Sequence, residues 1–175
     1  LEAVLVSEGM LSFILIDKKD ATVAEYRSEI IKVQELQTRY QDYLDEHVPM
    51  QCWINYIVAR LMIGMANVKD PKTGDYALPI EERRRRIDES LEVSYAIILG
   101  VSGFDDMAKM QKVFPHAIDP FILSGWVAAH SYKSYPKEER AKEDVRKLLD
   151  YNLKAAANAV EFAEKIGAKK ALYQA

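Results

Sequence analysis

The chain has 175 residues and a mass of 20.0 kDa, a size typical of one domain or of two very small ones. Hydrophobic residues make up 49% and charged residues 29%, which excludes intrinsic disorder, and seven glycines and six prolines exclude a collagenous chain. A net charge of −3 excludes a strongly basic nucleic-acid-binding protein. One cysteine excludes a disulfide framework and a cysteine-based zinc cluster. We therefore expect a single globular domain over residues 1–175.

The most apolar segment, residues 3–16, is predicted to form a buried helix. Its fourteen residues include a glutamate, a glycine and two serines, so it is too short to span a bilayer and too interrupted for a signal-peptide core. The alternative is the stub of a membrane anchor, with Lys18 and Lys19 just beyond it. Because the chain begins with Leu1 rather than Met, we expect a trimmed chain or part of a longer protein.

A long helix is predicted from the N-cap Asp20 to about His47, shortly before Pro49. Its heptad core positions alternate in steps of three and four, and they are Val23, Tyr26, Ile30, Val33, Gln37, Tyr40, Leu44 and His47. Ile31, Leu36 and Tyr43 widen this stripe beyond the seam of a two-stranded coiled coil, which favours packing inside a bundle. A contact with a second copy is then expected on another face.

Further helices follow, separated by proline, glycine and aspartate. Residues 49–68 are predicted to form a deeply buried helix, with apolar residues at Met50, Trp53, Ile54, Ile57, Val58, Leu61, Met62 and Met65 and with Asn55 and Arg60 off that face. A loop at 69–75 leads to a helix from Pro79 to Leu99, and shorter helices are predicted at 105–114 and 119–135. The last helix is predicted from Pro136 to Ile166, with an inner stripe at Val145, Leu148, Leu149, Leu153, Ala156, Val160, Ala163 and Ile166.

These elements predict an all-α fold, because no segment shows the two-residue alternation of a strand. Short connections favour an antiparallel helical bundle of four to five long helices with one or two short ones. The alternative is a short α-solenoid of helical hairpins, since the prolines at 49, 79, 115 and 136 are spaced semi-regularly. No fixed repeat period supports that alternative.

The four arginines at 83–86 turn through about 300° of a helix, so they cannot form one basic face. Glu81 and Glu82 lie four residues before Arg85 and Arg86, and Asp88 and Glu89 follow within a turn. This pattern predicts that the first turns of the helix are salt-bridged and solvated. A phosphate or nucleic-acid site is the disfavoured alternative.

Catalytic and metal-binding patterns are missing from the sequence. His47, His116 and His130 lie on three different predicted elements, and no histidine pair has the spacing that places two ligands on one helix face. There is no Gly-x-Ser-x-Gly and no phosphate-binding glycine loop with its lysine. We therefore predict no metal site, no cofactor and no catalytic residue, and expect a protein that is not an enzyme.

Aromatic residues with a polar tip give the strongest indication of a ligand site. The predicted pocket between helices is lined by Trp53, Tyr56, Tyr95, Trp126 and His130, with methionines nearby, and would take a small apolar or aromatic molecule. The alternative is that these side chains fill the core, as aromatic residues and methionines commonly do.

Two functions follow from these patterns. The first is a non-enzymatic helical module that acts through protein–protein contacts, with another protein or with a second copy of itself. The second is a small-molecule-binding or sensor domain built around the aromatic pocket. No nucleic acid and no transmembrane span are predicted. The unpaired Cys52 favours the reducing cytoplasm, and an extracytoplasmic fragment of a membrane-anchored protein is the alternative.

Overall fold

The computed structural model describes residues 1–100, 140–143, 145–147, 150, 153, 154, 157, 160, 161 and 164, without the side chains of residues 48, 49 and 94–100. Five helices lie in residues 1–100: α1 (Glu2–Ile16), α2 (Val23–Arg39), α3 (Gln41–Glu46), α4 (Val48–Ala66) and α5 (Ile80–Gly100). The chain divides into two compact units, residues 1–93 and residues 94–175. The protein is all-α, and the described residues contain no strand beyond an isolated bridge between Lys69 and Tyr76.

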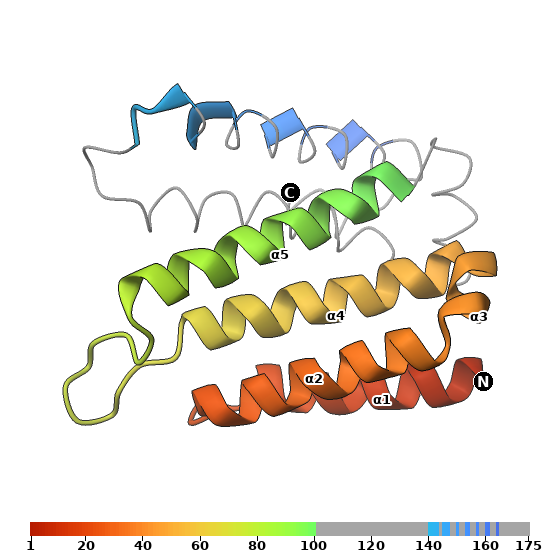
Figure 1. Ribbon diagram of the computed structural model, residues 1–175, viewed down its shortest axis with the longest axis horizontal. Coiled ribbons are helices and arrows are strands. Elements are labelled where there is room, and N and C mark those ends of the chain that lie inside the picture. Colours follow the sequence, from red (N-terminus) through yellow and green to blue (C-terminus); the bar gives the residue numbers. More distant parts are fainter. Residues whose placement is uncertain are drawn as a thin grey trace. The chain divides into compact units, whose positions relative to one another are not determined.

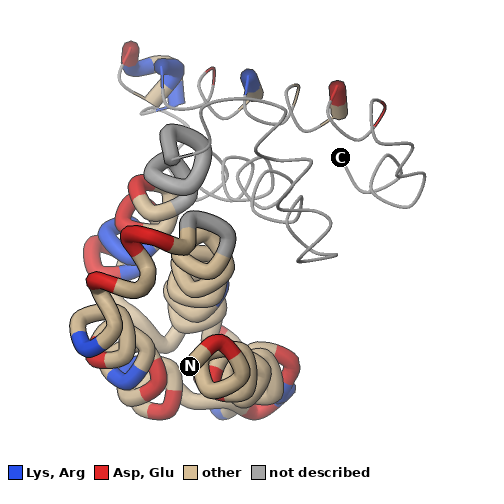
Figure 2. The backbone as a smooth tube through the Cα atoms, turned by 90° about the vertical axis from the view of Figure 1, so that its right-hand side faces the viewer, with Lys and Arg blue, Asp and Glu red and all other residues tan. Residues whose placement is uncertain are grey.

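The long helices of the first unit form an antiparallel bundle. From α1 to α2, α4 and the first part of α5, the chain reverses direction at each step (Figure 1). The helix α4 is the centre of this arrangement, and in Figure 2 it is the nearly uncharged tube between its neighbours. A central helix covered on several sides is characteristic of a bundle, so the predicted architecture is confirmed.

Each neighbour of α4 contacts a different part of its surface. The rings of Phe13 in α1 and Trp53 in α4 lie 5.4 Å apart between centroids. On the α2 side, the Gln37 amide donates to Asn55 Oδ1 at 2.7 Å. On the α5 side, Ser90 Oγ donates to the carbonyl oxygen of Ala59 at 3.1 Å. The predicted deep burial of α4 is confirmed, because twelve of its residues are buried: Met50, Cys52, Ile54, Tyr56, Ile57, Val58, Ala59, Leu61, Met62, Ile63, Met65 and Ala66.

The helix α2 begins with a capping box rather than at the predicted Asp20. Thr22 is the N-cap: its hydroxyl accepts from the backbone N–H of Glu25, while its own backbone N–H donates to the Glu25 carboxylate at 2.8 Å. Lys18 donates to the other oxygen of that carboxylate at 2.6 Å. Together these contacts hold the pKa of Glu25 at about 2, with the hydrogen bond from Lys18 as the largest cause.

The helix predicted from residue 20 to residue 47 is broken in two. Tyr40 leaves helical geometry at φ −116° and ψ 25°, and the short α3 follows it. The predicted stripe is nevertheless internal, because Tyr26, Ile30, Val33 and Leu44 are buried. Two of its proposed members are exposed: Ile31 turns about 100° away from the buried Ile30, and His47 stacks on Tyr43 at a ring separation of 3.8 Å.

The predicted loop between α4 and α5 is confirmed. Its tip is closed by backbone hydrogen bonds between Asp70 and Asp75 and between Gly74 and Asp70, both of 2.8 Å. Gly74 has a φ of 75°, which favours glycine because it has no Cβ. The Arg83 side chain of α5 donates to the carbonyl oxygen of Ala66, the last residue of α4, at 3.0 Å. This hydrogen bond links the end of α4 to the beginning of α5, on either side of the loop.

In the second unit, the described residues from 143 to 164 are helical. Residues 140–142 form a turn and a bend, so the predicted helix does not run unbroken from Pro136. Val145 is buried as predicted, but Leu153, predicted on the same inner stripe, is 57% exposed. The helices predicted at 105–114 and 119–135 lie outside the described residues. The prediction of a single domain over residues 1–175 stays a prediction.

Candidate functional site

The surface of α1 that points away from the bundle is apolar. It carries Leu1, Val4, Met10, Leu11 and Ile14, which we call the outer face of α1. These side chains are between 47% and 69% exposed, and Ile14 is the most exposed of them. Only Glu2 and Glu8 are charged within the helix. Scattered apolar residues are normal on a protein surface, but a row of them along one helix indicates a contact site.

The opposite side of α1 fixes which residues point outwards. Leu5, Gly9 and Ser12 are buried, and Ser12 Oγ donates to Glu29 Oε1 of α2 at 2.8 Å. A Cβ added to Gly9 would lie 2.5 Å from Cδ1 of Ile57, so any larger residue at this position would require the Ile57 side chain to shift. The small residues therefore mark the buried side, and the outer face lies opposite them.

The prediction that residues 3–16 form a helix is confirmed, but the prediction that this helix is buried is wrong for most of its surface. In the described bundle, α1 lies at the edge against α2 and α4, as the end view in Figure 2 shows. A helix at the edge has neighbours on one side only, so apolar residues distributed around its circumference cannot all be covered. The signal that identifies the covered side is the pair of small residues Gly9 and Ser12.

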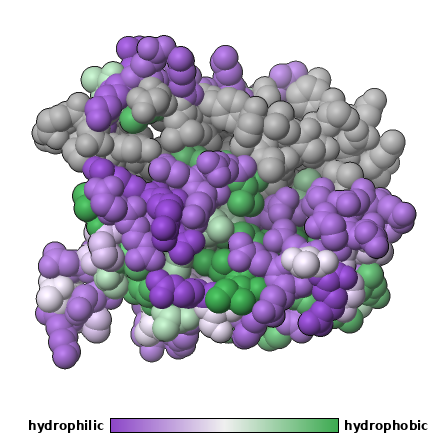
Figure 3. All heavy atoms as spheres, viewed as in Figure 1, coloured by the Kyte–Doolittle hydropathy of each residue, from purple (hydrophilic) through white to green (hydrophobic). Residues whose placement is uncertain are grey.

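The surface over α2 has a different character. Viewed from the α2 side, the described residues are mainly hydrophilic, with hydrophobic patches among them (Figure 3). Exposed charged residues line the outside of α2: Arg27, Lys32, Glu35 and Arg39. The apolar outer face of α1 is therefore not a general property of the bundle surface.

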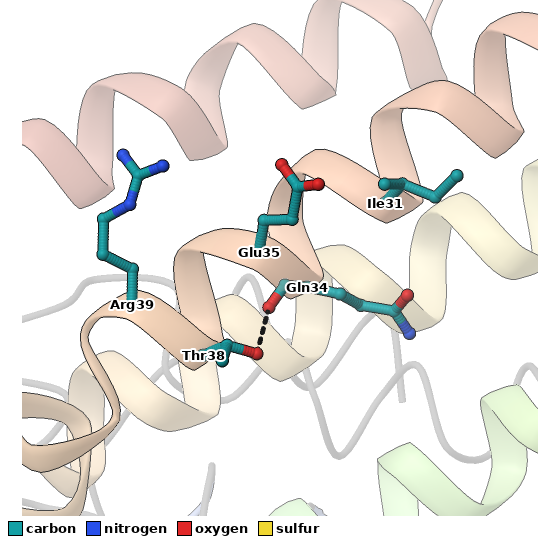
Figure 4. Close-up of a pocket in the computed structure, with 5 residues that line it drawn as sticks. All are labelled: Ile31, Gln34, Glu35, Thr38 and Arg39. Carbon is teal, nitrogen blue, oxygen red and sulfur yellow. Dashed lines mark hydrogen bonds between the residues drawn. The ribbon is translucent and has the colours of Figure 1, made fainter.

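A shallow depression of about 590 Å³ also lies on α2, lined by Ile31, Gln34, Glu35, Thr38 and Arg39. Its side chains diverge from the helix instead of converging on a common point (Figure 4). The hydrogen bond drawn there, from the Thr38 hydroxyl to the Gln34 carbonyl oxygen at 3.0 Å, is internal to the helix. A ligand site needs polar groups that converge, so this depression is not a candidate.

Two residues of the predicted aromatic pocket are brought together between α1 and α4. Trp53 and Tyr56 both contact the ring of Phe13, with centroid separations of 5.4 and 5.7 Å. The Tyr56 hydroxyl accepts from Arg60 at 3.0 Å, and the Arg60 guanidinium lies over the Phe13 and Tyr56 rings. These contacts are those of packed core residues, and Tyr56 is buried.

The side chains of the other three residues predicted for that pocket lie outside the described residues. The backbone of Tyr95 lies in α5, but its side chain is outside the described residues, as are Trp126 and His130 entirely. The small-molecule site therefore stays a prediction.

The arginine run is salt-bridged, as predicted, although with different partners. Arg84 pairs with Glu81, Arg86 pairs with Glu89, and Arg85 lies 4.0 Å from Glu82 and 3.8 Å from Glu89. Three of these pairs have i, i+3 spacing instead of the expected i, i+4 spacing. Glu82 also pairs with Arg27 of α2 at 3.0 Å, which links α5 to α2.

The described residues hold no group of three metal-ligating side chains. Cys52 is buried, and burial raises the pKa of its thiol to about 11, so the thiolate needed for nucleophilic chemistry is disfavoured. In the part of the chain that the structure describes, no helix combines the length and apolarity needed to cross a membrane. Comparison with known proteins finds no matching family model, no similar curated protein and no similar solved structure.

Proposed function

We propose that this chain is a non-enzymatic association module that binds another protein surface through the outer face of α1. The observation that carries this proposal is the exposure of five large apolar side chains along one helix. Burying an aliphatic side chain fully contributes about 1.5–3 kcal/mol, so covering these residues is favourable. Among the described residues, no side chain covers the outer face enough to bury it.

A protein partner fits the outer face better than a membrane surface does. Helices that lie on membranes carry lysine and arginine beside their apolar face, which attract anionic lipids. The two charged residues within α1, Glu2 and Glu8, are both acidic and would be repelled by such a surface. Of the two lysines that follow α1, Lys18 is ion-paired to Glu25 at 2.6 Å. Protein interfaces, in contrast, have apolar centres that are depleted of charge.

The proposal is tested by placing a photoreactive benzophenone amino acid at Ile14 in the whole chain and irradiating cells that produce it. We expect adducts with protein at this position, because Ile14 is the most exposed residue of the outer face. The matched control is the same amino acid at Ser28, an exposed position on α2 that should give at least fivefold less adduct.

Mass spectrometry of the purified adducts identifies what covers the outer face. Peptides from a second protein molecule, identical or different, support the proposal. Adducts with lipid, adducts within the same chain, or equal yields at both positions contradict it.

A further inference from the structure

The outer face of α1 contains one sulfur atom that is open to reagents in solution. It belongs to Met10, which is 54% exposed. The other three methionines that the structure describes lie in α4, where Met50, Met62 and Met65 are 2%, 5% and 1% exposed. Among these four residues, Met10 therefore differs from the rest in its access to solvent.

Oxidation would convert this apolar side chain into a polar one. Hydrogen peroxide transfers one oxygen atom to the thioether sulfur, which is oxidised to a sulfoxide, while the peroxide is reduced to water. A sulfoxide reductase reverses the change with two electrons taken from thiols, and the oxygen atom leaves as water. The modification is thus reversible, and it needs no catalytic residue of this chain.

Met10 lies beside the most exposed residue of the outer face. With about 100° per residue, Met10 and Leu11 are displaced from Ile14 by about 40° and 60° around the helix, in opposite directions. The three side chains therefore form one continuous apolar surface. A sulfoxide at Met10 would introduce a polar group into that surface.

The sulfoxide would affect association and not the fold. Met10 lies off the side of α1 that buries Leu5, Gly9 and Ser12, so the added oxygen stays hydrated in the free chain. Beneath a protein partner the same oxygen would lose its water. Burying a polar group without a hydrogen-bonding partner weakens binding by about tenfold or more.

We propose that Met10 is a redox modification site whose oxidation by peroxide releases the protein partner from the outer face of α1. This inference rests on the proposed function and adds the regulation of the same site. The thioether form of Met10 permits the contact, the sulfoxide form prevents it, and reduction restores it.

The first measurement compares the four methionines in the purified whole chain. Limited treatment with hydrogen peroxide, followed by peptide mass spectrometry, should oxidise Met10 about tenfold faster than Met50, Met62 and Met65, because those three are buried. Far-UV circular dichroism of the product should retain the helical signal. Equal rates at the four positions, or unfolding that accompanies oxidation of Met10, would overturn the inference.

The second measurement asks whether this oxidation controls association in cells. With the benzophenone amino acid at Val4, a brief exposure to peroxide should lower the yield of protein adducts by about fivefold or more. Met10→Leu should keep its yield under peroxide, because leucine is apolar and has no sulfur. Met10→Gln, whose side chain is always polar, should give the low yield without peroxide.

The matched control moves the thioether to another surface of the bundle. The double variant Met10→Leu/Ile31→Met carries its exposed methionine on α2, where Ile31 is 50% exposed. This methionine should be oxidised about as fast as Met10, while the yield of protein adducts at Val4 stays high. If peroxide lowers the yield equally in wild type and in Met10→Leu, it acts on another group and the inference is overturned.

The outcomes separate this inference from the proposed function. If neither Ile14 nor Val4 gives protein adducts without peroxide, both are overturned. If adducts form and persist after Met10 is oxidised, the inference is overturned and the proposed function stands. Loss of the adducts in wild type, with recovery once the sulfoxide is reduced, supports both.

Discussion

The helices α1 and α4 are similar in composition but differ in their surroundings. Each is almost free of charge: α1 contains Glu2 and Glu8, and α4 contains only Arg60. Twelve residues of α4 are buried, whereas α1 buries only Leu5, Gly9 and Ser12. The helix α4 contacts α1, α2 and α5, while α1 lies at the edge of the described bundle. Apolar composition thus shows what a helix is able to bury, and the number of its neighbours decides what it does bury.

The largest expected effect comes from the same truncation made in both helices. Leu61→Ala in α4 should lower the free energy of unfolding by about 2–5 kcal/mol, because Leu61 is fully buried and a cavity would remain. Leu11→Ala in α1 should change it by less than about 0.5 kcal/mol, because Leu11 is 55% exposed. Urea unfolding below 1 µM protein measures both values. Equal losses would show that the two helices are covered alike.

The next effect tests how closely α4 approaches its neighbours. In Gly64→Ala, the new Cβ would lie 2.5 Å from Cε1 of the Tyr26 ring, so this rigid side chain must move. We expect a net loss of about 1–3 kcal/mol despite the higher helix propensity of alanine. Thermal unfolding measures the loss. The control Gly74→Asn changes a loop glycine that has free space around it, and asparagine tolerates positive φ, so a smaller loss is expected. A stabilised Gly64→Ala protein would contradict the close packing.

A smaller effect is expected at the beginning of α2, outside the buried contacts of both helices. Thr22→Ala removes the side-chain cap and should lower the free energy of unfolding by about 1 kcal/mol. Thr22→Ser keeps the hydroxyl and should retain most of that stability. Chemical denaturation of the three proteins makes the comparison. No difference between the alanine and serine variants would show that the capping box does not stabilise the helix.

The smallest effect concerns the pH dependence of that same cap. The pKa of Glu25 is lowered from 4.5 to about 2 in the folded protein, mainly by the hydrogen bond from Lys18. Because the folded pKa is the lower one, this contribution is present above about pH 4.5 and is lost as the pH falls towards 2. The stability difference between wild type and Glu25→Gln should therefore shrink over this range. A difference that does not change with pH would contradict the assignment.

Much of this fold was predictable because its signals are local. The prolines at 49 and 79 and the heptad spacing through Ile30 and Val33 placed the long helices correctly. The break at Tyr40 was not predicted, because the apolar spacing continues through it and the break is visible only in the backbone angles. The cap at Thr22 was missed in favour of Asp20, although Glu25 three residues later completes a capping box.

The candidate site was less predictable, because exposure depends on contacts between distant segments. The sequence shows that residues 3–16 are apolar, but not that α2 and α4 cover only one side of them. Gly9 and Ser12 indicate the covered side only when the partner helix is known. For the predicted aromatic site, the structure describes the side chains of Trp53 and Tyr56. The side chains of Tyr95, Trp126 and His130 lie outside the described residues.

The central claim is that the outer face of α1 associates with protein and is not part of the folded core. The most direct measurement combines photo-crosslinking in cells with urea unfolding for the double variant Leu11→Asp/Ile14→Asp. We expect its free energy of unfolding at low concentration to stay within about 1 kcal/mol of wild type, because both side chains are exposed. With the benzophenone amino acid at Val4, the double variant should lose its protein adducts in cells, whereas Ile31→Asp, at an equally apolar exposed position on α2, should retain them. A loss of several kcal/mol, or protein adducts that persist in the double variant, would contradict the claim.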